Sequence, residues 1–242
     1  MMRVLVLSHR VAPGILTLPA WDALREASVV RAAVDDPHVQ AIVSAGIAVQ
    51  VLDGPPPYEP GSVWIAPTGD AVLAQAAADE LEGAGRDVEV LFGSYDLPGA
   101  GVLDVVEVMD RLRRECPWTA QQTHESLAPY VLEEAQETYE TLEAGDSEHL
   151  REELGDLLMQ VVFHARIAAE ASADEGEGWD IDDVAAGIAA KLVRRNPHVF
   201  APETLESLPT TAAEIDAQWQ AIKAQERSGG EASPGVDTPG LR

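Results

Sequence analysis

The spacing of hydrophobic residues changes character near residue 100. In the first part of the chain, short runs rich in β-branched residues alternate with patches of apolar residues at helical spacing. This pattern predicts strands at 3–7, 48–52, 63–66 and 88–92, and helices at 20–31 and 71–82. Such alternation is typical of a small α/β domain with a mainly parallel sheet. We therefore expect an α/β domain over residues 1–98, with a glycine- and proline-rich linker at 94–101.

After residue 102 the apolar positions recur every three or four residues, which predicts helices at 102–115, 126–143, 147–170, 184–196 and 208–227. Gly145 is a good helix terminator, and Asp146 or Ser147 can cap the helix that follows. A break this short predicts an antiparallel helical hairpin. The expected fold class is α+β overall, with an all-α domain over 102–228 after the α/β domain. The tail at 229–242, rich in Gly, Pro and Ser, is expected to be disordered.

The charge balance limits the possible partners. The chain has 16 basic and 42 acidic residues, a net charge of −26. This surface repels phosphate backbones, so we expect no nucleic-acid partner. A phosphate-bearing ligand can bind only where metal ions or local cations reverse the sign of the field. The chain has only two lysines, Lys191 and Lys223, so their positions are informative.

The chain shows no sign of secretion or membrane insertion. Its single cysteine, Cys116, excludes an intramolecular disulfide and fits a reducing compartment. The apolar run at the N-terminus is too short for the core of a signal peptide, and no run of about 18 apolar residues could cross a membrane. We therefore expect a soluble, cytoplasmic protein without a membrane partner.

Four carboxylates converge on the predicted hairpin. Glu134 and Glu137 are neighbours on one helix, and Glu153 and Asp156 are neighbours on the other. Because the hairpin is centred near Gly145, all four lie at one level along it. Converging carboxylates in a partly buried place require cations, and Mg²⁺ is the usual ion where phosphates complete the coordination. In so acidic a chain, spacing alone leaves both a metal site and a solvated acidic face open.

The motifs around these carboxylates resemble those of a known family. They read CPW at 116–118, QTH at 122–124, PYVLEE at 129–134, ELGDLL at 153–158, QVVFHA at 160–165 and KLVRRNPHVF at 191–200. This ordered set resembles the MazG family of nucleoside triphosphate pyrophosphohydrolases over roughly residues 102–228. The resemblance implies that the family's ExxE…ExxD motif, the catalytic and metal-binding set, falls on Glu134, Glu137, Glu153 and Asp156.

The same resemblance implies an activity and a second set of residues. The expected reaction is Mg²⁺-dependent hydrolysis of a nucleoside triphosphate to the monophosphate and pyrophosphate, by an all-α homodimer, as nucleotide-pool house-cleaning. The nucleobase stays open, because base selectivity depends on the shape of the pocket. Trp219 either stacks on a base or anchors the core. The positions that the family uses for nucleotide binding fall on Lys191, Arg194, Arg195, Trp219 and Lys223.

Two narrower points complete the resemblance. The chain departs from the family pattern at Thr119, Gln136, His149 and Asn196, and His149 stands where a lysine contact is common. Residues 11–18, 36–39 and 67–70 resemble remnants of a tetrapyrrole methylase domain that is too short for the second half of that fold. The first segment is therefore expected to act as a scaffold or dimer contact.

Two alternative functions also fit these residues. One is a narrow all-α hydrolase for dUTP or phosphoribosyl-ATP. The other is a non-catalytic nucleotide or metal sensor that binds partners through the α/β segment. An assay of pyrophosphate and monophosphate release from each triphosphate separates them from the leading hypothesis.

Overall fold

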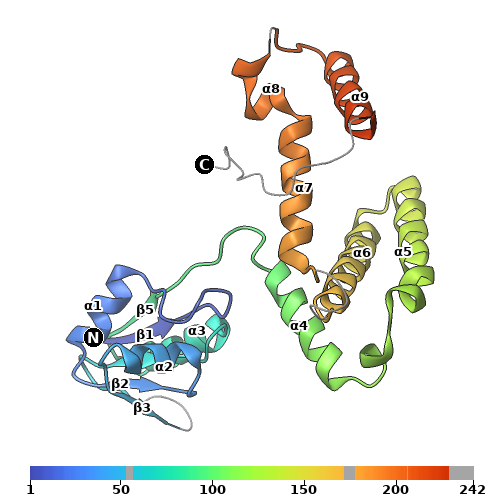
Figure 1. Cartoon of the computed structure of the whole chain (residues 1–242). Helices are drawn as coiled ribbons and strands as arrows, with labels where there is room; N and C mark the ends of the chain where they lie inside the picture. The colour runs from blue at the N-terminus through green and yellow to red at the C-terminus, as the bar shows by residue number, and fades with distance from the viewer. Residues whose placement is uncertain (53–56, 172–177, 206, 229–242) are drawn as a thin grey trace. The chain divides into compact units, whose positions relative to one another are not determined.

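The chain divides into two compact units, Met1–Asp104 and Val105–Arg242. The computed structural model describes residues 1–52, 57–171, 178–205 and 207–228 (Figure 1). The tail predicted to be disordered, at 229–242, lies outside the described residues. Across those described ranges, no helix is both long enough and apolar enough to span a membrane.

The first unit contains a parallel sheet of five strands in the order β3-β2-β4-β1-β5. The strands are β1 (Met2–Val6), β2 (Val30–Ala32), β3 (Val49–Val51), β4 (Val63–Ile65) and β5 (Val88–Phe92). The helices are α1 (Leu18–Glu26), α2 (Pro37–Ser44) and α3 (Ala71–Gly83). The predicted mixture of a parallel sheet with a helical region is thereby confirmed.

Side-chain alternation along β1 explains why both faces of the sheet are covered. Leu5 and Leu7 are buried in a cluster with residues of α1 and α2. Val4 and Val6 point to the opposite face and are buried with alanines of α3. A strand that is apolar on both faces requires helices on both faces, as in other parallel sheets.

The prediction of one helix over 20–31 is wrong in its second half. Helix α1 ends at Glu26, and its cap, Ala27, has extended backbone. Val30 and Ala32 are buried in β2, between β3 and β4, so tertiary pairing outweighs the helical spacing of that segment. Helix α2 was not predicted, although Asp36 caps its third residue and Pro37 occupies its first position, a typical helix start.

The second unit is helical throughout its described part. Helix α5 ends at Gly145, whose φ of 71° is left-handed, and the Asp146 side chain then accepts hydrogen bonds from the first turn of α6. The two helices pack as the predicted antiparallel hairpin. The elements are α4 (Val102–Glu115), η1 (Thr119–Gln121), α5 (His124–Ala144), α6 (Ser147–Ala168), α7 (Ile181–Arg195), α8 (Pro197–Phe200), η2 (Pro202–Thr204) and α9 (Ala212–Ser228).

A small core fixes the hairpin. Met109 of α4, Leu127 of α5 and Val162 and Phe163 of α6 are buried together. This cluster lies toward the start of α5 and the end of α6. The middle of the hairpin, by contrast, carries the carboxylates described next.

Candidate active site

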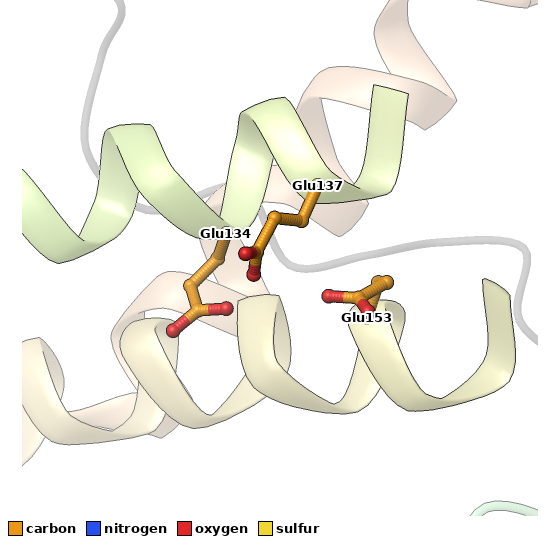
Figure 2. Close-up of side chains that lie close together, drawn as sticks. All are labelled: Glu134, Glu137 and Glu153. Carbon is orange, nitrogen blue, oxygen red and sulfur yellow. The ribbon is translucent and has the colours of Figure 1, made fainter. Parts of the chain in front are cut away.

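Three of the four predicted carboxylates meet between α5 and α6. Glu134 and Glu137 extend from α5 and Glu153 from α6, and one oxygen of each lies within 4.8 Å of the others (Figure 2). Oxygen ligands on opposite sides of one Mg²⁺ are about 4 Å apart, because each bond is about 2.1 Å long. The three side chains therefore fit a single hard divalent ion with small adjustments of their rotamers.

The electrostatics of this cluster favour a cation. Partial burial, followed by the negative charge of Asp156, raises the pKa of Glu134. Partial desolvation, followed by the charge of Glu153, likewise raises the pKa of Glu137. Both carboxylates are thus held where ionisation is unfavourable without a counterion. A divalent ion would remove this repulsion and satisfy the oxygens.

Asp156 is the fourth predicted ligand and lies outside the group of three. It is half-buried on α6, three residues after Glu153, and it is the strongest of the like charges that act on Glu134. A residue at this spacing lies on the same helix face. Asp156 is therefore placed to complete a ligand set, or to hold a second ion beside the first.

The predicted basic residues form a separate group on α7 and α9. The Arg195 guanidinium lies 4.9 Å from the centre of the Trp219 ring, and the Lys223 ammonium lies 5.1 Å from it. Arg194 and Arg195 both donate to Glu226, whose pKa these hydrogen bonds lower to about 2. Among the described residues, no hydrogen bond or ion pair joins this group to the three glutamates.

Within the described part of the chain, the two lysines of this group form no ion pair, unlike Arg194 and Arg195. Lys191 is exposed on α7 and Lys223 is half-buried on α9, and the described part of the chain gives neither an acidic partner. Trp219 is half-buried under two cations, so the two interpretations of its role, base contact and packing anchor, both remain predictions.

Comparison of the sequence with known protein families gives one match that contains these residues. The family of the MazG nucleotide pyrophosphohydrolase domain matches residues 122–200, which include all four carboxylates and the basic end of α7. The chain contains a MazG-family domain. The resemblance of the first hundred residues to tetrapyrrole methylases stays a prediction.

Curated relatives agree with this assignment. The chain is 52% identical over 163 residues to an uncharacterized 26.1 kDa protein of Streptomyces cacaoi, which covers 66% of this chain and 64% of that protein. It is 45% identical over 130 residues to a nucleoside triphosphate pyrophosphohydrolase of Mycobacterium tuberculosis, which covers 54% of this chain and 38% of that protein. The Escherichia coli K12 protein of the same name is 43% identical over 127 residues, covering 51% and 45%. The chain thus spans less than half the length of the two named hydrolases.

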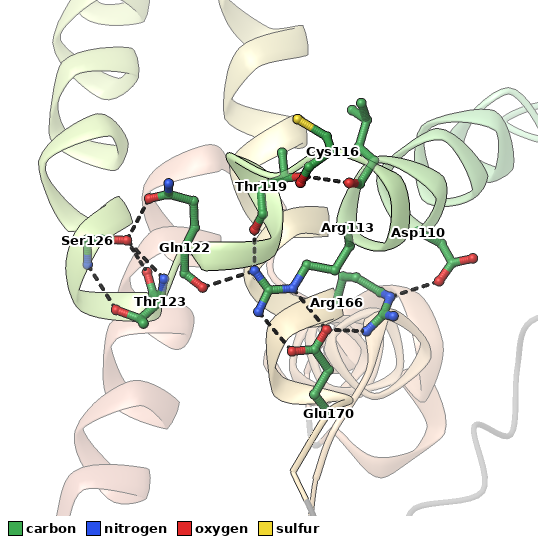
Figure 3. A network of polar contacts seen from close by, with 10 residues as sticks. Asp110, Arg113, Cys116, Thr119, Gln122, Thr123, Ser126, Arg166 and Glu170 are labelled. Carbon is green, nitrogen blue, oxygen red and sulfur yellow. Dashed lines mark hydrogen bonds and ion pairs between the residues drawn. The ribbon is translucent and has the colours of Figure 1, made fainter.

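The loop before α5 is held by one arginine, Arg113, whose side chain is only 9% exposed. Arg113 of α4 donates to the carbonyl oxygens of Thr119 and Gln122 and forms an ion pair with Glu170, at 2.8 Å (Figure 3). Thr123 then caps α5. This network fixes the start of α5, and therefore the height of Glu134 and Glu137 along the hairpin.

His149, which stands where the family pattern often has a lysine, forms a local contact in the structure. Its Nδ1 lies 2.8 Å from a carboxylate oxygen of Asp146, and this contact raises the pKa of His149. Asp146 is the N-cap of α6 and His149 lies in the first turn of that helix, so the imidazole is engaged by a local carboxylate. Sequence reasoning missed this local partner, although a spacing of three residues from a capping aspartate indicates it.

Neutralising Glu134 should stabilise the metal-free protein. A carboxylate with a raised pKa contributes most to stability below its unfolded-state value, and this contribution is lost as the pH rises through the folded-state value. At pH 7 the ionised Glu134 therefore destabilises the fold. Of the thermal unfolding transitions, the relevant one is that whose midpoint shifts when Mg²⁺ is added to wild type. We expect Glu134→Gln to raise the midpoint of this transition by about 1–3 °C when both proteins are measured in EDTA. The difference should shrink toward pH 4, and calorimetry measures both.

The matched control is Glu140→Gln, an exposed glutamate of the same helix whose side chain accepts a hydrogen bond from Gln136. It should leave the midpoint nearly unchanged. A lower midpoint for Glu134→Gln than for wild type in EDTA would show that Glu134 stabilises the apo fold, contrary to this prediction.

Proposed function

We propose that the MazG domain hydrolyses nucleoside triphosphates to nucleoside monophosphates and pyrophosphate, with Mg²⁺ held by Glu134, Glu137, Glu153 and Asp156. The observation that carries the proposal is the convergence of three glutamates with mutually unfavourable charge between α5 and α6. The relatives named as nucleoside triphosphate pyrophosphohydrolases support the choice of reaction.

The reaction breaks the bond between the α-phosphorus and the oxygen that bridges to the β-phosphate. Water supplies the new oxygen on the α-phosphorus, pyrophosphate leaves with the bridging oxygen, and the excess proton passes to solvent. Bound Mg²⁺ would supply neutralisation of phosphate charge and acidification of water. The carboxylates would hold the ions, and Lys191, Arg194, Arg195 and Lys223 attract the phosphate chain. Trp219 offers an aromatic face to the base.

The test uses the purified chain with Mg²⁺ and each common or oxidised nucleoside triphosphate, including dUTP, and with phosphoribosyl-ATP. Release of monophosphate and pyrophosphate in equal amounts is the expected result. Release of orthophosphate with diphosphate would contradict the proposed bond cleavage. Binding without turnover would favour the sensor function, and activity on dUTP or phosphoribosyl-ATP alone would favour the narrow hydrolase.

We also propose that the domain acts as a homodimer through one apolar side of the hairpin. Leu132 of α5 is 74% exposed, and Tyr139 and Leu142 follow it at helical spacing. Leu154 and Val161 form the equivalent stripe on α6, each more than 40% exposed. In an antiparallel hairpin these spacings place Leu142, Leu154 and Val161 on one side of the seam that holds the carboxylates. Leu132 and Tyr139 extend this apolar surface over the outer face of α5. An unpaired apolar face of two helices fits a second hairpin of the same kind.

Introducing a charge on this face should separate the subunits. We expect Leu132→Glu to convert a dimer into a monomer at micromolar concentration, because a buried unpaired carboxylate in the interface is strongly unfavourable. Light scattering coupled to size exclusion measures the mass. Val72→Glu is the matched control, since Val72 is 82% exposed on α3 of the other unit. If Leu132→Glu keeps the wild-type mass, another surface forms the dimer.

A further inference from the structure

Polar residues continue the face of α6 that carries the carboxylates, and one of them, Gln160, is buried. Glu153, Asp156, Gln160 and His164 follow one another at spacings of three, four and four residues. Residues at these spacings lie on one face of a helix. Gln160 therefore lies one turn beyond Asp156, between the carboxylates and His164. The face that binds the proposed ion and substrate extends at least to this residue.

Gln160 is buried without a partner for its amide oxygen. Only 5% of the residue is exposed, and Oε1 has no hydrogen-bond donor in the part of the chain that the structure describes. A buried acceptor without a donor costs about 1–3 kcal/mol of folding free energy. An apolar side chain is therefore favoured at such a position unless a bound group supplies the donor. Leucine or methionine would fill the same space at no such cost. The amide is thus unfavourable for folding alone.

Within residues 1–52, 57–171, 178–205 and 207–228, no group donates a hydrogen bond to this oxygen. The neighbouring carboxylates accept hydrogen bonds when ionised. The two Nδ1 atoms of His124 and His164 lie 2.7 Å apart, so each of them is engaged by the other. The α5 backbone facing this level is helical, so its N–H groups are engaged, and Pro129 has none. An amide oxygen selects an O–H or N–H group over a phosphate oxygen, so the described residues leave this acceptor to a donor on a bound reactant.

We propose that Gln160 is a positioning residue whose amide oxygen accepts a hydrogen bond from an O–H group held beside the carboxylates during the reaction. This proposal rests on the proposed hydrolase function. Two groups could supply this O–H donor: the water that attacks the phosphorus, and a hydroxyl of the nucleotide sugar. In both, Gln160 orients a reactant toward the ion site without contacting the ion itself.

The decisive variant is Gln160→Leu, which keeps the volume and removes the acceptor. We expect the unfolding midpoint to stay equal to wild type or to rise, while kcat/KM falls about tenfold or more. The affinity for Mn²⁺ alone, measured by calorimetry, should stay within about twofold of wild type. If Gln160 has only a structural role, Gln160→Leu should have a lower unfolding midpoint than wild type. Its kcat/KM should then be unchanged, or should fall only in proportion to the fraction of protein that is folded.

Gln136→Leu is the matched control, because Gln136 is an exposed glutamine of α5 that bonds only to Glu140 among the described residues. It should leave kcat/KM unchanged. Nucleotides that lack the 2′- or the 3′-hydroxyl distinguish the two sources. If a sugar hydroxyl is the donor, wild type loses activity on one of these analogues and Gln160→Leu does not. If water is the donor, the variant loses kcat equally on every sugar and keeps its KM.

Measurements on the wild-type protein show separately whether the proposed hydrolase function is wrong. If wild type does not turn over but binds the α,β-methylene analogue of ATP, hydrolysis is excluded and the affinity of Gln160→Leu for that analogue decides this proposal. Weaker binding by the variant supports it, and equal binding overturns it. Wild type that neither hydrolyses nor binds overturns both. An active wild type with an equally active Gln160→Leu overturns only the role of Gln160.

Discussion

Glu153→Gln should lower magnesium-dependent pyrophosphate release by about a hundredfold or more, with the fold intact. Glu153 is the residue through which α6 reaches the two glutamates of α5. An amide cannot supply the charge that holds a divalent ion against the solvation of that ion by water. The loss should appear in kcat and in the Mg²⁺ concentration for half-maximal rate, measured by the coupled detection of pyrophosphate.

Glu140→Gln again serves as the control, since it removes one negative charge from α5 outside the group of three. It should keep at least half of the wild-type rate. Circular dichroism should show the same helix content for both variants. Wild-type rates for Glu153→Gln would mean that the glutamates form only an acidic surface, and that the proposed metal site is wrong.

Lys223→Gln should raise KM for nucleoside triphosphates by about tenfold or more, with a smaller change in kcat. The chain has a net charge of −26 and only two lysines, so a tetra-anionic substrate depends on few local cations. Arg194 and Arg195 share the carboxylate of Glu226, whereas Lys223 lies over Trp219 without an acidic partner in the described part of the chain. Steady-state kinetics at several substrate concentrations separates the two constants.

The salt dependence gives an independent check. Added NaCl should raise the wild-type KM more steeply than that of Lys223→Gln, because screening weakens an attraction that the variant has already lost. Arg111→Gln, which removes an exposed cation of α4 that pairs with Glu115, should keep the wild-type KM and its salt dependence. If Lys223→Gln matches Arg111→Gln, the basic group of α7 and α9 does not bind the phosphates.

The register of the carboxylates could be predicted because it depends on local rules. Gly145 sets the end of α5 and Asp146 the start of α6, and from these two residues a rise of 1.5 Å per residue fixes which side chains share a level. The same rules gave β5 and α4 their observed bounds. They failed at β2, where a segment with helical spacing is held extended by hydrogen bonds to strands distant in the sequence.

By itself the sequence determined the two-part architecture, the hairpin and the identity of the residues that could hold an ion, because capping and periodicity act over a few residues. Only the tertiary structure decided how those groups are charged and paired. It left Asp156 outside the group formed by Glu134, Glu137 and Glu153, and it paired Arg194 and Arg195 with Glu226, 31 or more residues away. It also buried the Gln160 amide without a donor. These properties depend on long-range packing and desolvation, and no spacing along the chain encodes them.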